Sequence, residues 1–143
     1  MGKIYREHTE RAMVLYHKSI FRYWEQWMSL HHTINYLEMP VKNIQSTKDF
    51  FGQVFGWEFV DYGPEYSCFL NAGITGGFYL SEQDFTLTKG SPLLVIYSNE
   101  LANSLQKVTD AGGTISKPVF EFPGGRRFHF LDPNGNEYAI WSE

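Results

Sequence analysis

The sequence predicts an α+β domain in which two βαβββ modules form a half-closed barrel, preceded by an amphipathic helix. Three observations support this prediction. The order of strand, helix ending in glycine and three strands occurs twice, in residues 31–81 and 92–142. A polar, irregular stretch, residues 82–91, separates the two copies. The turn sequence Asp132-Pro133-Asn134-Gly135 predicts that the last two strands form a hairpin.

Residues 1–27 are interpreted as a helical appendage to a domain that spans residues 28–143. From about residue 7 to residue 27, apolar side chains recur at spacings of three and four, which favours an amphipathic helix. This helix packs on its own domain or on a dimer partner, or lies on a membrane surface. An expression artefact or a misassigned start at residue 1 is the remaining alternative.

Composition limits the class of protein. The net charge of −4 argues against a nucleic-acid partner. Residues 1–27 carry +2, so the rest of the chain carries −6, the difference between −4 and +2. The single cysteine, Cys68, excludes an internal disulfide and fits a reducing cytoplasm. No apolar run approaches the roughly 20 residues of a membrane span. We therefore expect a cytoplasmic protein without a membrane or nucleic-acid partner. A homodimer, to whose interface the N-terminal helix contributes, is a separate expectation.

In the first module, a strand is predicted at residues 33–41, followed by a helix that Asn43 caps and Gly56 ends. Strands are predicted at residues 57–62, 66–70 and 75–81. The pair Gly76-Gly77 in the last of these predicts a bulge or a close approach of another element.

In the second module, a strand is predicted at residues 92–97, and Ser98 or Asn99 is expected to cap a helix that ends at Gly112-Gly113. Further strands are predicted at residues 114–122, 126–131 and 137–141. Strand alternation predicts which side chains line the groove between the modules: Tyr36, Glu38, Glu137, Ala139 and Trp141. Their neighbours are expected to pack against the helices: Leu37, Met39, Tyr138 and Ile140.

Three stretches resemble the vicinal oxygen chelate superfamily, which includes glyoxalase I, bleomycin-resistance proteins and extradiol dioxygenases. They are residues 41–57, which resemble the end of its first strand, its helix and the start of its second strand, Gly76-Gly77-Phe78 in its fourth strand, and residues 130–136 at its closing hairpin. The resemblance covers about residues 31–142 and implies the fold more specifically than the function, because this superfamily contains isomerases, dioxygenases, lyases and binding proteins.

The resemblance also implies where a divalent metal ion would bind, through His on the first strand and Glu on the last strand of each module. These positions fall on Tyr36, on Gly76 to Phe78, on a strand without histidine at residues 93–97, and on Ala139. Alanine cannot ligate a metal, and neutral tyrosine is a poor ligand. The sequence is therefore similar to a glyoxalase-like branch that lacks the usual ligands, and we expect no metal and no cofactor.

Glu38 and His129 are the candidate catalytic residues. A carboxylate in an aromatic groove can act as a base or hold a cation. A salt bridge to Arg126 or Arg127, or simple exposure, would also explain Glu38. His129 can shuttle a proton, although a hydrogen-bonded histidine on a sheet face is the simpler reading.

The predicted ligand-binding residues are mainly aromatic, because aromatic side chains line pockets for flat or apolar ligands. Core packing and solvent exposure are the alternative readings for these residues. They are Tyr36, Trp57, Tyr66, Cys68, Tyr79, Tyr97, Arg127, Glu137 and Trp141.

Two functions follow. The first is metal-independent binding of a small amphipathic or cationic molecule in the aromatic groove. The second is a glyoxalase-like lyase or isomerase, or a dioxygenase. It would use Glu38 and His129 in acid–base chemistry or an unusual metal site. That site would use His32, Glu38, His129 and Glu137.

Overall fold

The computed structural model of the chain describes residues 30–143. The helix predicted at residues 7–27 and the domain boundary at residue 28 therefore lie outside the described residues. The described elements, in chain order, are β1 (Tyr36–Val41), α2 (Ile44–Phe55), β2 (Glu58–Asp61), β3 (Tyr66–Leu70), β4 (Thr75–Leu80), η1 (Leu87–Lys89), β5 (Leu94–Tyr97), α3 (Leu101–Asp110), β6 (Thr114–Phe122), β7 (Gly125–Leu131) and β8 (Glu137–Ser142).

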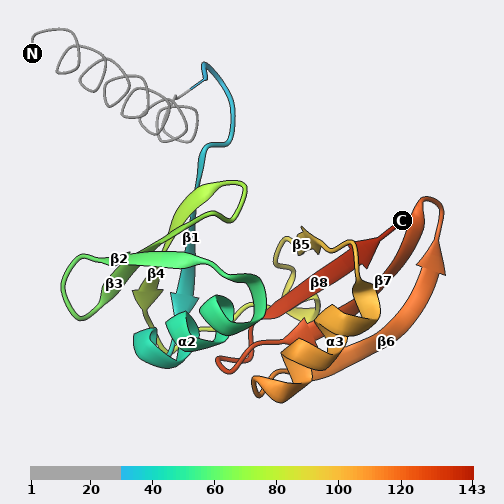
Figure 1. The fold of residues 1–143 in the computed structure, drawn as a ribbon. Coiled ribbons are helices and arrows are strands. Elements are labelled where there is room, and N and C mark those ends of the chain that lie inside the picture. Colours follow the sequence, from blue (N-terminus) through green and yellow to red (C-terminus); the bar gives the residue numbers. More distant parts are fainter. Residues whose placement is uncertain (1–29) are drawn as a thin grey trace, which may run out of the picture.

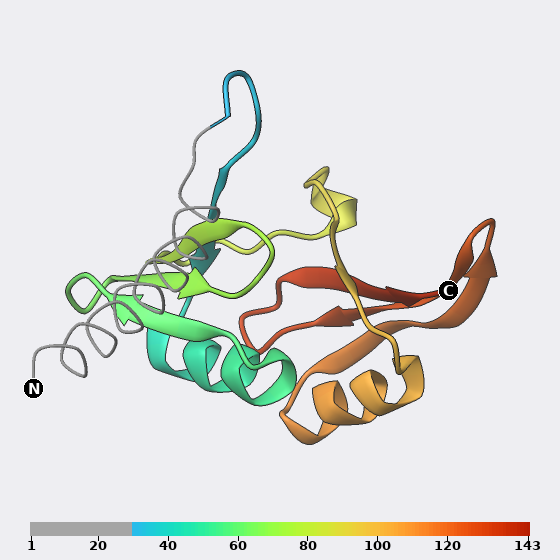
Figure 2. The ribbon, with the colours of Figure 1, turned by 45° about the horizontal axis from the view of Figure 1, so that its top comes forward.

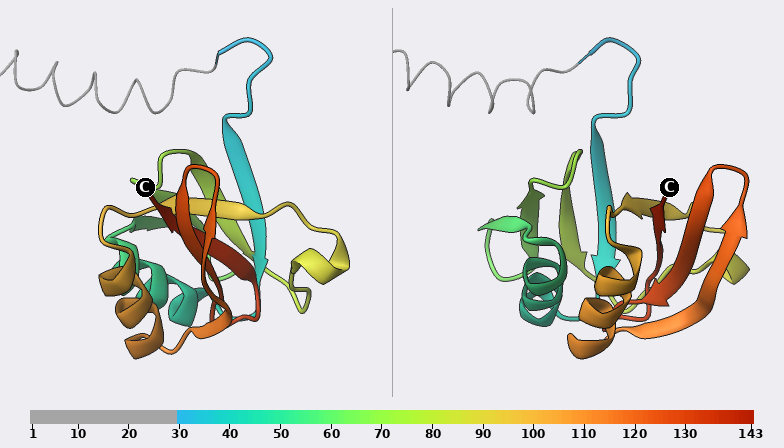
Figure 3. Two further views of the ribbon diagram at one scale, coloured as in Figure 1. Left: turned by 90° about the vertical axis from the view of Figure 1, so that its right-hand side faces the viewer. Right: turned by 45° about the vertical axis from the view of Figure 1, so that its right-hand side comes forward.

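The strands form two four-stranded sheets with the same topology, β1-β4-β3-β2 and β5-β8-β7-β6 (Figure 1). In each module the first and last strands pair in parallel, and the other pairs are antiparallel. Helices α2 and α3 contact each other where the modules meet (Figure 3). Within the described residues the sheets do not close into a barrel. The predicted α+β fold of two βαβββ modules is confirmed.

Helix α2 begins and ends as its sequence predicts. The Asn43 side chain accepts a hydrogen bond of 2.8 Å from the backbone N–H of Ser46, which satisfies one of the free donors at the helix start. Gly56 ends the helix with φ of 71°, a conformation that glycine adopts without steric cost.

Two predicted boundaries are wrong. Strand β1 starts at Tyr36 rather than Thr33, because both the backbone N–H and the hydroxyl of Thr33 donate to the carbonyl of Leu30 and close a turn before the strand. Glu100 precedes α3 in the capping position without a side-chain cap. Ser98 instead accepts from the backbone N–H of Glu100, so its hydroxyl closes a turn ahead of the helix.

The core lies between the helices and the faces of the two sheets that carry the predicted inward residues. Met39 is 5% exposed, Tyr138 is 1% exposed and Ile140 is fully buried. Leu37 packs against the same cluster. The prediction that these four side chains pack inward, against the helices, is therefore confirmed. No helix within residues 30–143 is long and apolar enough to span a lipid bilayer.

The turn between β7 and β8 is buried and folds around the Asp132 carboxylate. Its Oδ1 accepts hydrogen bonds of 2.9 Å from the backbone N–H groups of Asn134 and Asn136. Its Oδ2 accepts a bond of 3.0 Å from the Asn134 side chain. Burial raises the pKa of Asp132, and these hydrogen bonds act in the opposite direction.

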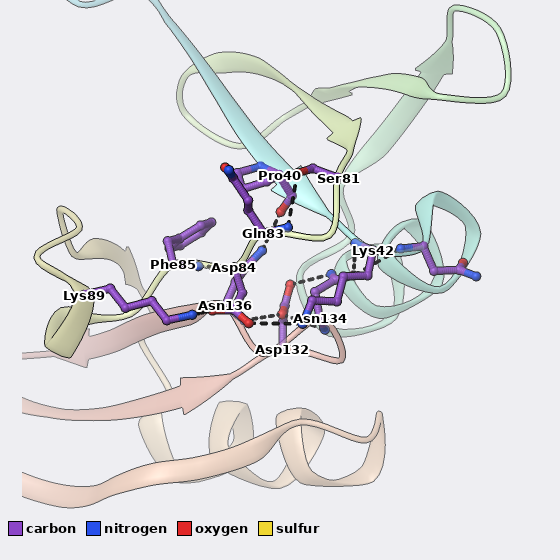
Figure 4. Close-up of polar contacts among 11 residues, drawn as sticks. Pro40, Lys42, Ser81, Gln83, Asp84, Phe85, Lys89, Asp132, Asn134 and Asn136 are labelled. Atoms are coloured by element: carbon purple, nitrogen blue, oxygen red, sulfur yellow. Dashed lines mark hydrogen bonds and ion pairs between the residues drawn. The ribbon is translucent and has the colours of Figure 1, made fainter.

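The two asparagines of this turn bind the first module, as Figure 4 shows. Asn134 accepts from the backbone N–H of Lys42 at 2.9 Å. It also donates to the hydroxyl of Thr47 at 2.8 Å. Asn136 donates to the carbonyl of Pro40 at 2.7 Å and accepts from the backbone N–H of Phe85 at 3.0 Å. The closing hairpin of the second module therefore holds the end of β1, the start of α2 and the linker.

The linker between the modules extends away from both and carries η1 (Figure 2). Asp84 binds Lys42, at 3.1 Å, and Lys89, and these contacts lower its pKa. The carbonyl of Phe85 accepts from the backbone N–H of Glu137 at 2.9 Å. These contacts hold the linker against the end of β1 and the start of β8.

Candidate functional site

A line of hydrogen bonds joins four of the predicted site residues on the first sheet. The Tyr66 hydroxyl donates to Oε1 of Glu38 at 2.9 Å. The Tyr36 and Tyr66 hydroxyl oxygens lie 2.6 Å apart, and the Tyr36 hydroxyl lies 3.3 Å from Sγ of Cys68. These side chains come from β1 and β3 on the face that points away from α2. Tyr36, Glu38, Tyr66 and Cys68 are hereafter called the tyrosine–glutamate cluster.

The proton positions in this cluster follow from the acceptor at its end. An ionised carboxylate only accepts hydrogen bonds, so the Tyr66 proton points to Glu38. The Tyr66 oxygen is then free to accept from Tyr36, and the Tyr36 oxygen accepts from the thiol of Cys68. Burial, followed by the bonds to Cys68 and Tyr66, raises the pKa of Tyr36, and burial also raises the pKa of Tyr66. Both phenols therefore remain protonated donors at neutral pH.

Gly77 makes room for this arrangement. It lies between Glu38 and Cys68 in the sheet register. A Cβ atom at Gly77 would lie 2.1 Å from the hydroxyl oxygen of Tyr66, so only glycine lets this ring cross β4 toward Glu38. At the adjacent Gly76, a Cβ atom would lie 2.3 Å from the carbonyl oxygen of Leu37. Of the two predicted readings of the glycine pair, close approach is the correct one.

A cavity of about 250 Å³ opens beside Glu38 between β1, the linker and β5. Most of its lining is apolar, and among the residues from 30 to 143 that line it, Glu38 is the one ionisable group. The lining includes Glu38, Pro40, Phe85, Ser91, Pro92 and Leu94. Glu38 itself is exposed, and it forms no ion pair with any residue from 30 to 143. Of the two simpler explanations of Glu38, the salt bridge to Arg126 or Arg127 is absent from the described residues, whereas exposure is observed.

The other candidate catalytic residue, His129, lies on β7 of the second sheet and is 3% exposed. Its Nδ1 lies 4.0 Å from Oε2 of Glu137, and its Nε2 is buried without a hydrogen-bond partner. Burial, followed by the charge of Arg127, lowers the pKa of His129, so the ring is neutral at pH 7. Glu38 and His129 lie on different sheets and do not contact each other.

Three further predicted ligand-binding residues lie on the same face of the second sheet as His129. The guanidinium of Arg127 lies 5.1 Å from the ring centroid of Phe120. Trp141 is opposite Arg127 in the ladder and packs edge-on against Tyr97 at 5.2 Å. Tyr97 is half exposed.

The remaining predicted residues have other positions. Oε2 of Glu137 accepts from the backbone N–H of Leu87 at 3.2 Å, so this carboxylate helps to hold the linker. Tyr79 is paired with Tyr66 in the ladder, beside the tyrosine–glutamate cluster. Trp57 stacks on Phe51 at 4.8 Å in the core, away from this cluster. Trp57 also lines a second, smaller cavity of about 90 Å³ with Phe69 and Leu94, so its role in ligand binding stays a prediction.

The residues at the family's metal positions do not fit a divalent ion. The hydroxyl of Tyr36 is engaged by Tyr66 and Cys68, and Ala139 is fully buried and has no ligating atom. Among residues 30–143, no three His, Cys, Asp or Glu side chains converge. The alternative set of His32, Glu38, His129 and Glu137 is therefore not assembled. His32 instead stacks on His31 in the turn before β1.

Sequence reasoning missed residues at both sheets. Phe85, Ser91 and Pro92 line the cavity, but they belong to the stretch that reads only as a linker. Lys117 and Phe120 adjoin Arg127 and His129, but irregularities in β6 after Ile115 and after Lys117 interrupt the alternation that would have revealed this.

The family model for the Glyoxalase/Bleomycin resistance protein/Dioxygenase superfamily matches residues 33–140. Because this match covers most of the sequence, the chain belongs to that superfamily. No curated protein sequence matches it significantly.

Solved structures share this fold. A glyoxalase-related enzyme from Fulvimarina pelagi aligns with a TM-score of 0.66 and 20% identity over 78% of this chain and 88% of its own. A glyoxalase/bleomycin resistance protein/dioxygenase family enzyme from Burkholderia phytofirmans aligns with a TM-score of 0.65 and 19% identity over 76% of this chain and 96% of its own. The fosfomycin resistance protein FosX from Listeria monocytogenes aligns with a TM-score of 0.65 and 18% identity over 80% of this chain and 95% of its own. At these identities the comparisons establish the fold alone.

Proposed function

We propose that this chain binds a small amphipathic cation in the cavity beside Glu38, without a metal ion. One observation carries the proposal: Glu38 lines a mainly apolar cavity, and its carboxylate accepts from the hydroxyl of Tyr66 rather than from a cation. A carboxylate without an ion pair attracts a positive group, and the apolar walls favour a hydrocarbon body.

The surroundings of Glu38 suit this role. Tyr66 fixes Oε1, and no described residue bonds to Oε2, which leaves that oxygen for a ligand. The charge of −6 on residues 28–143 adds a modest attraction for cations. The enzymatic alternative has less support, because Glu38 and His129 are on different sheets and the unusual metal set is not assembled.

Calorimetric titration with phenyltrimethylammonium tests the proposal, with benzyl alcohol as a neutral aromatic control. We expect the cation to bind and Glu38→Gln to weaken it about five- to tenfold, which is the loss of one partly exposed charge contact. Glu58→Gln is a matched control, because Glu58 is an exposed carboxylate of the same sheet that does not line the cavity. Equal affinity of the wild type and Glu38→Gln for the cation would contradict the proposal.

Metal content of the protein purified without chelator provides a second test. We expect no stoichiometric retention after incubation with Ni²⁺, Zn²⁺, Fe²⁺ or Mn²⁺. Retention of about one ion per chain that Glu38→Gln abolishes would overturn the proposal in favour of metal-dependent catalysis.

The proposal includes a cytoplasmic homodimer. Leu30 and Ile34, which are 62% and 82% exposed, are apolar side chains that a second copy would cover. Light scattering that gives the mass of one chain would exclude the dimer.

A further inference from the structure

Three basic side chains surround Phe120 on the second sheet. Nζ of Lys117 lies 4.2 Å from the centre of the Phe120 ring, and the guanidinium carbon of Arg127 lies 5.1 Å from it. The centres of the His129 and Phe120 rings are 5.8 Å apart. Lys117 is opposite His129 in the ladder and Phe120 is opposite Arg127, so all four side chains share one face of β6 and β7.

The positive charge of this group is not neutralised within the described residues. Neither Lys117 nor Arg127 forms an ion pair with any residue from 30 to 143. Glu137 is the acid nearest to His129, but its Oε2 is bound to the backbone of Leu87. Arg127 is held against the rings of Phe120 and Phe122, contacts that leave the planar donor edge of a guanidinium free.

Two polar atoms in this group are buried without a partner. Nε of Arg127 and Nε2 of His129 form no hydrogen bond, and His129 is 3% exposed. Buried polar atoms are almost always hydrogen-bonded, because an unpaired one has lost its hydration without compensation. An unpaired guanidinium nitrogen and an unpaired imidazole nitrogen two residues apart on one strand indicate that a further polar group belongs beside them.

We propose that Lys117, Phe120, Arg127 and His129 form a site for a small organic oxyanion, a carboxylate or a phosphonate. The fork of Arg127 and the point charge of Lys117 match an anionic head group. The ring of Phe120 supplies apolar surface for the body of the ligand. The site lies on the other sheet from Glu38 and has the opposite charge, so it does not rest on the proposed function.

His129 reports occupancy of this site. In the free protein, burial and the charges of Arg127 and Lys117 lower its pKa, and Glu137 raises it. These three groups, Lys117 from β6, Arg127 from β7 and Glu137 from β8, are the charged groups that act on the ring. A bound oxyanion would oppose the two cations and raise the pKa of His129.

The test titrates the full chain with benzoate and with phenylphosphonate at low salt, while NMR follows the His129 ring signal across pH. We expect saturable binding of at least one probe and a rise in the pKa of His129 on saturation. The tighter of the two identifies the class of head group, and phenyltrimethylammonium should leave this signal unchanged. No binding of either probe up to about 10 mM, a range that covers very weak ligands, would overturn the proposal.

A pair of variants separates the local contact from the overall charge. Arg127→Gln should weaken oxyanion binding about tenfold, the loss of one charge-assisted pair. Arg126→Gln makes the same change of charge at the adjacent exposed residue and should change affinity less than about twofold. Equal losses of affinity in the two variants would mean that the overall charge of the protein attracts the oxyanion, and would overturn the proposal. Lys117→Gln provides the same comparison if Arg127→Gln does not fold.

Discussion

The two modules share a topology but differ in the charge of the faces that point away from their helices. On the first sheet, the tyrosine–glutamate cluster ends at the Glu38 carboxylate, which accepts a hydrogen bond from the Tyr66 hydroxyl. On the second sheet, Lys117 and Arg127 place unpaired positive charge around Phe120. The repeated fold thus presents one anionic and one cationic surface.

The equivalent central residues show how this difference arises. Gly77 lies between Glu38 and Cys68, and its counterpart Ala139 lies between Val95 and His129. A small residue at the centre of each sheet leaves room for larger side chains from the neighbouring strands. The repeat therefore sets where functional side chains can stand, and the residues beside the small one set the chemistry.

The largest effect should come from adding a side chain at Gly76, the neighbour of Gly77 in β4. In Gly76→Ala the new Cβ would lie 2.3 Å from both the Leu37 carbonyl oxygen and the Phe69 ring, so β1 must move. We expect a loss of about 3 kcal/mol or more in the free energy of unfolding. Ala139→Gly in the second sheet should lose only about 1 kcal/mol. Urea denaturation of the two variants measures both, and equal losses would show that Gly76 is not constrained.

A smaller effect should follow from breaking the link between the modules. Asn136→Ala removes the bonds to the Pro40 carbonyl and the Phe85 N–H, which leaves two partly buried backbone groups unpaired. We expect a loss of about 2 kcal/mol. Asn103→Ala is the control, because Asn103 bonds only to the exposed Glu100 and should change stability by less than about 0.5 kcal/mol. Similar urea midpoints for the two variants would contradict the inference that the Asn136 hydrogen bonds stabilise the contact between the modules.

The smallest effect concerns pH and belongs to the second sheet. The pKa of His129 is lowered in the folded state, so below its unfolded value of about 6.5 the unfolded chain binds more protons than the folded chain. The free energy of unfolding should therefore decrease as pH falls below about 6.5 toward the folded pKa. Thermal unfolding of His129→Gln, compared with the wild type across pH, should show a weaker decrease. Identical slopes would assign the pH dependence to other groups.

Local pattern was sufficient for much of the fold. The N-cap at Asn43, the glycine stop at Gly56 and the inward alternation of Tyr138 and Ile140 are confirmed, because each depends on a few neighbouring residues. The start of α3 was misplaced because Ser98 and Asn99 both suit a cap, and the hydroxyl of Ser98 bonds to the backbone ahead of the helix.

The candidate site was predicted less completely. Period-two alternation placed Tyr36 and Glu38 on one face of β1, but it could not show that the Tyr66 ring crosses Gly77 to reach them. Nor could it show that Trp57 stacks on Phe51, away from the tyrosine–glutamate cluster.

The sequence by itself determined the two modules and their strand and helix order, because these follow from periodicity, turn residues and spacing along the chain. The family followed from the resemblance of residues 41–57, 76–78 and 130–136 to the vicinal oxygen chelate superfamily. The tertiary structure alone decided which charges remain unpaired. Glu137 is bound by the linker, whereas Glu38, Arg127 and Lys117 have no oppositely charged partner among residues 30–143. Pairing depends on distances between residues far apart in the chain, on irregularities in β6 and on the buried turn at Asp132, none of which a one-dimensional pattern encodes.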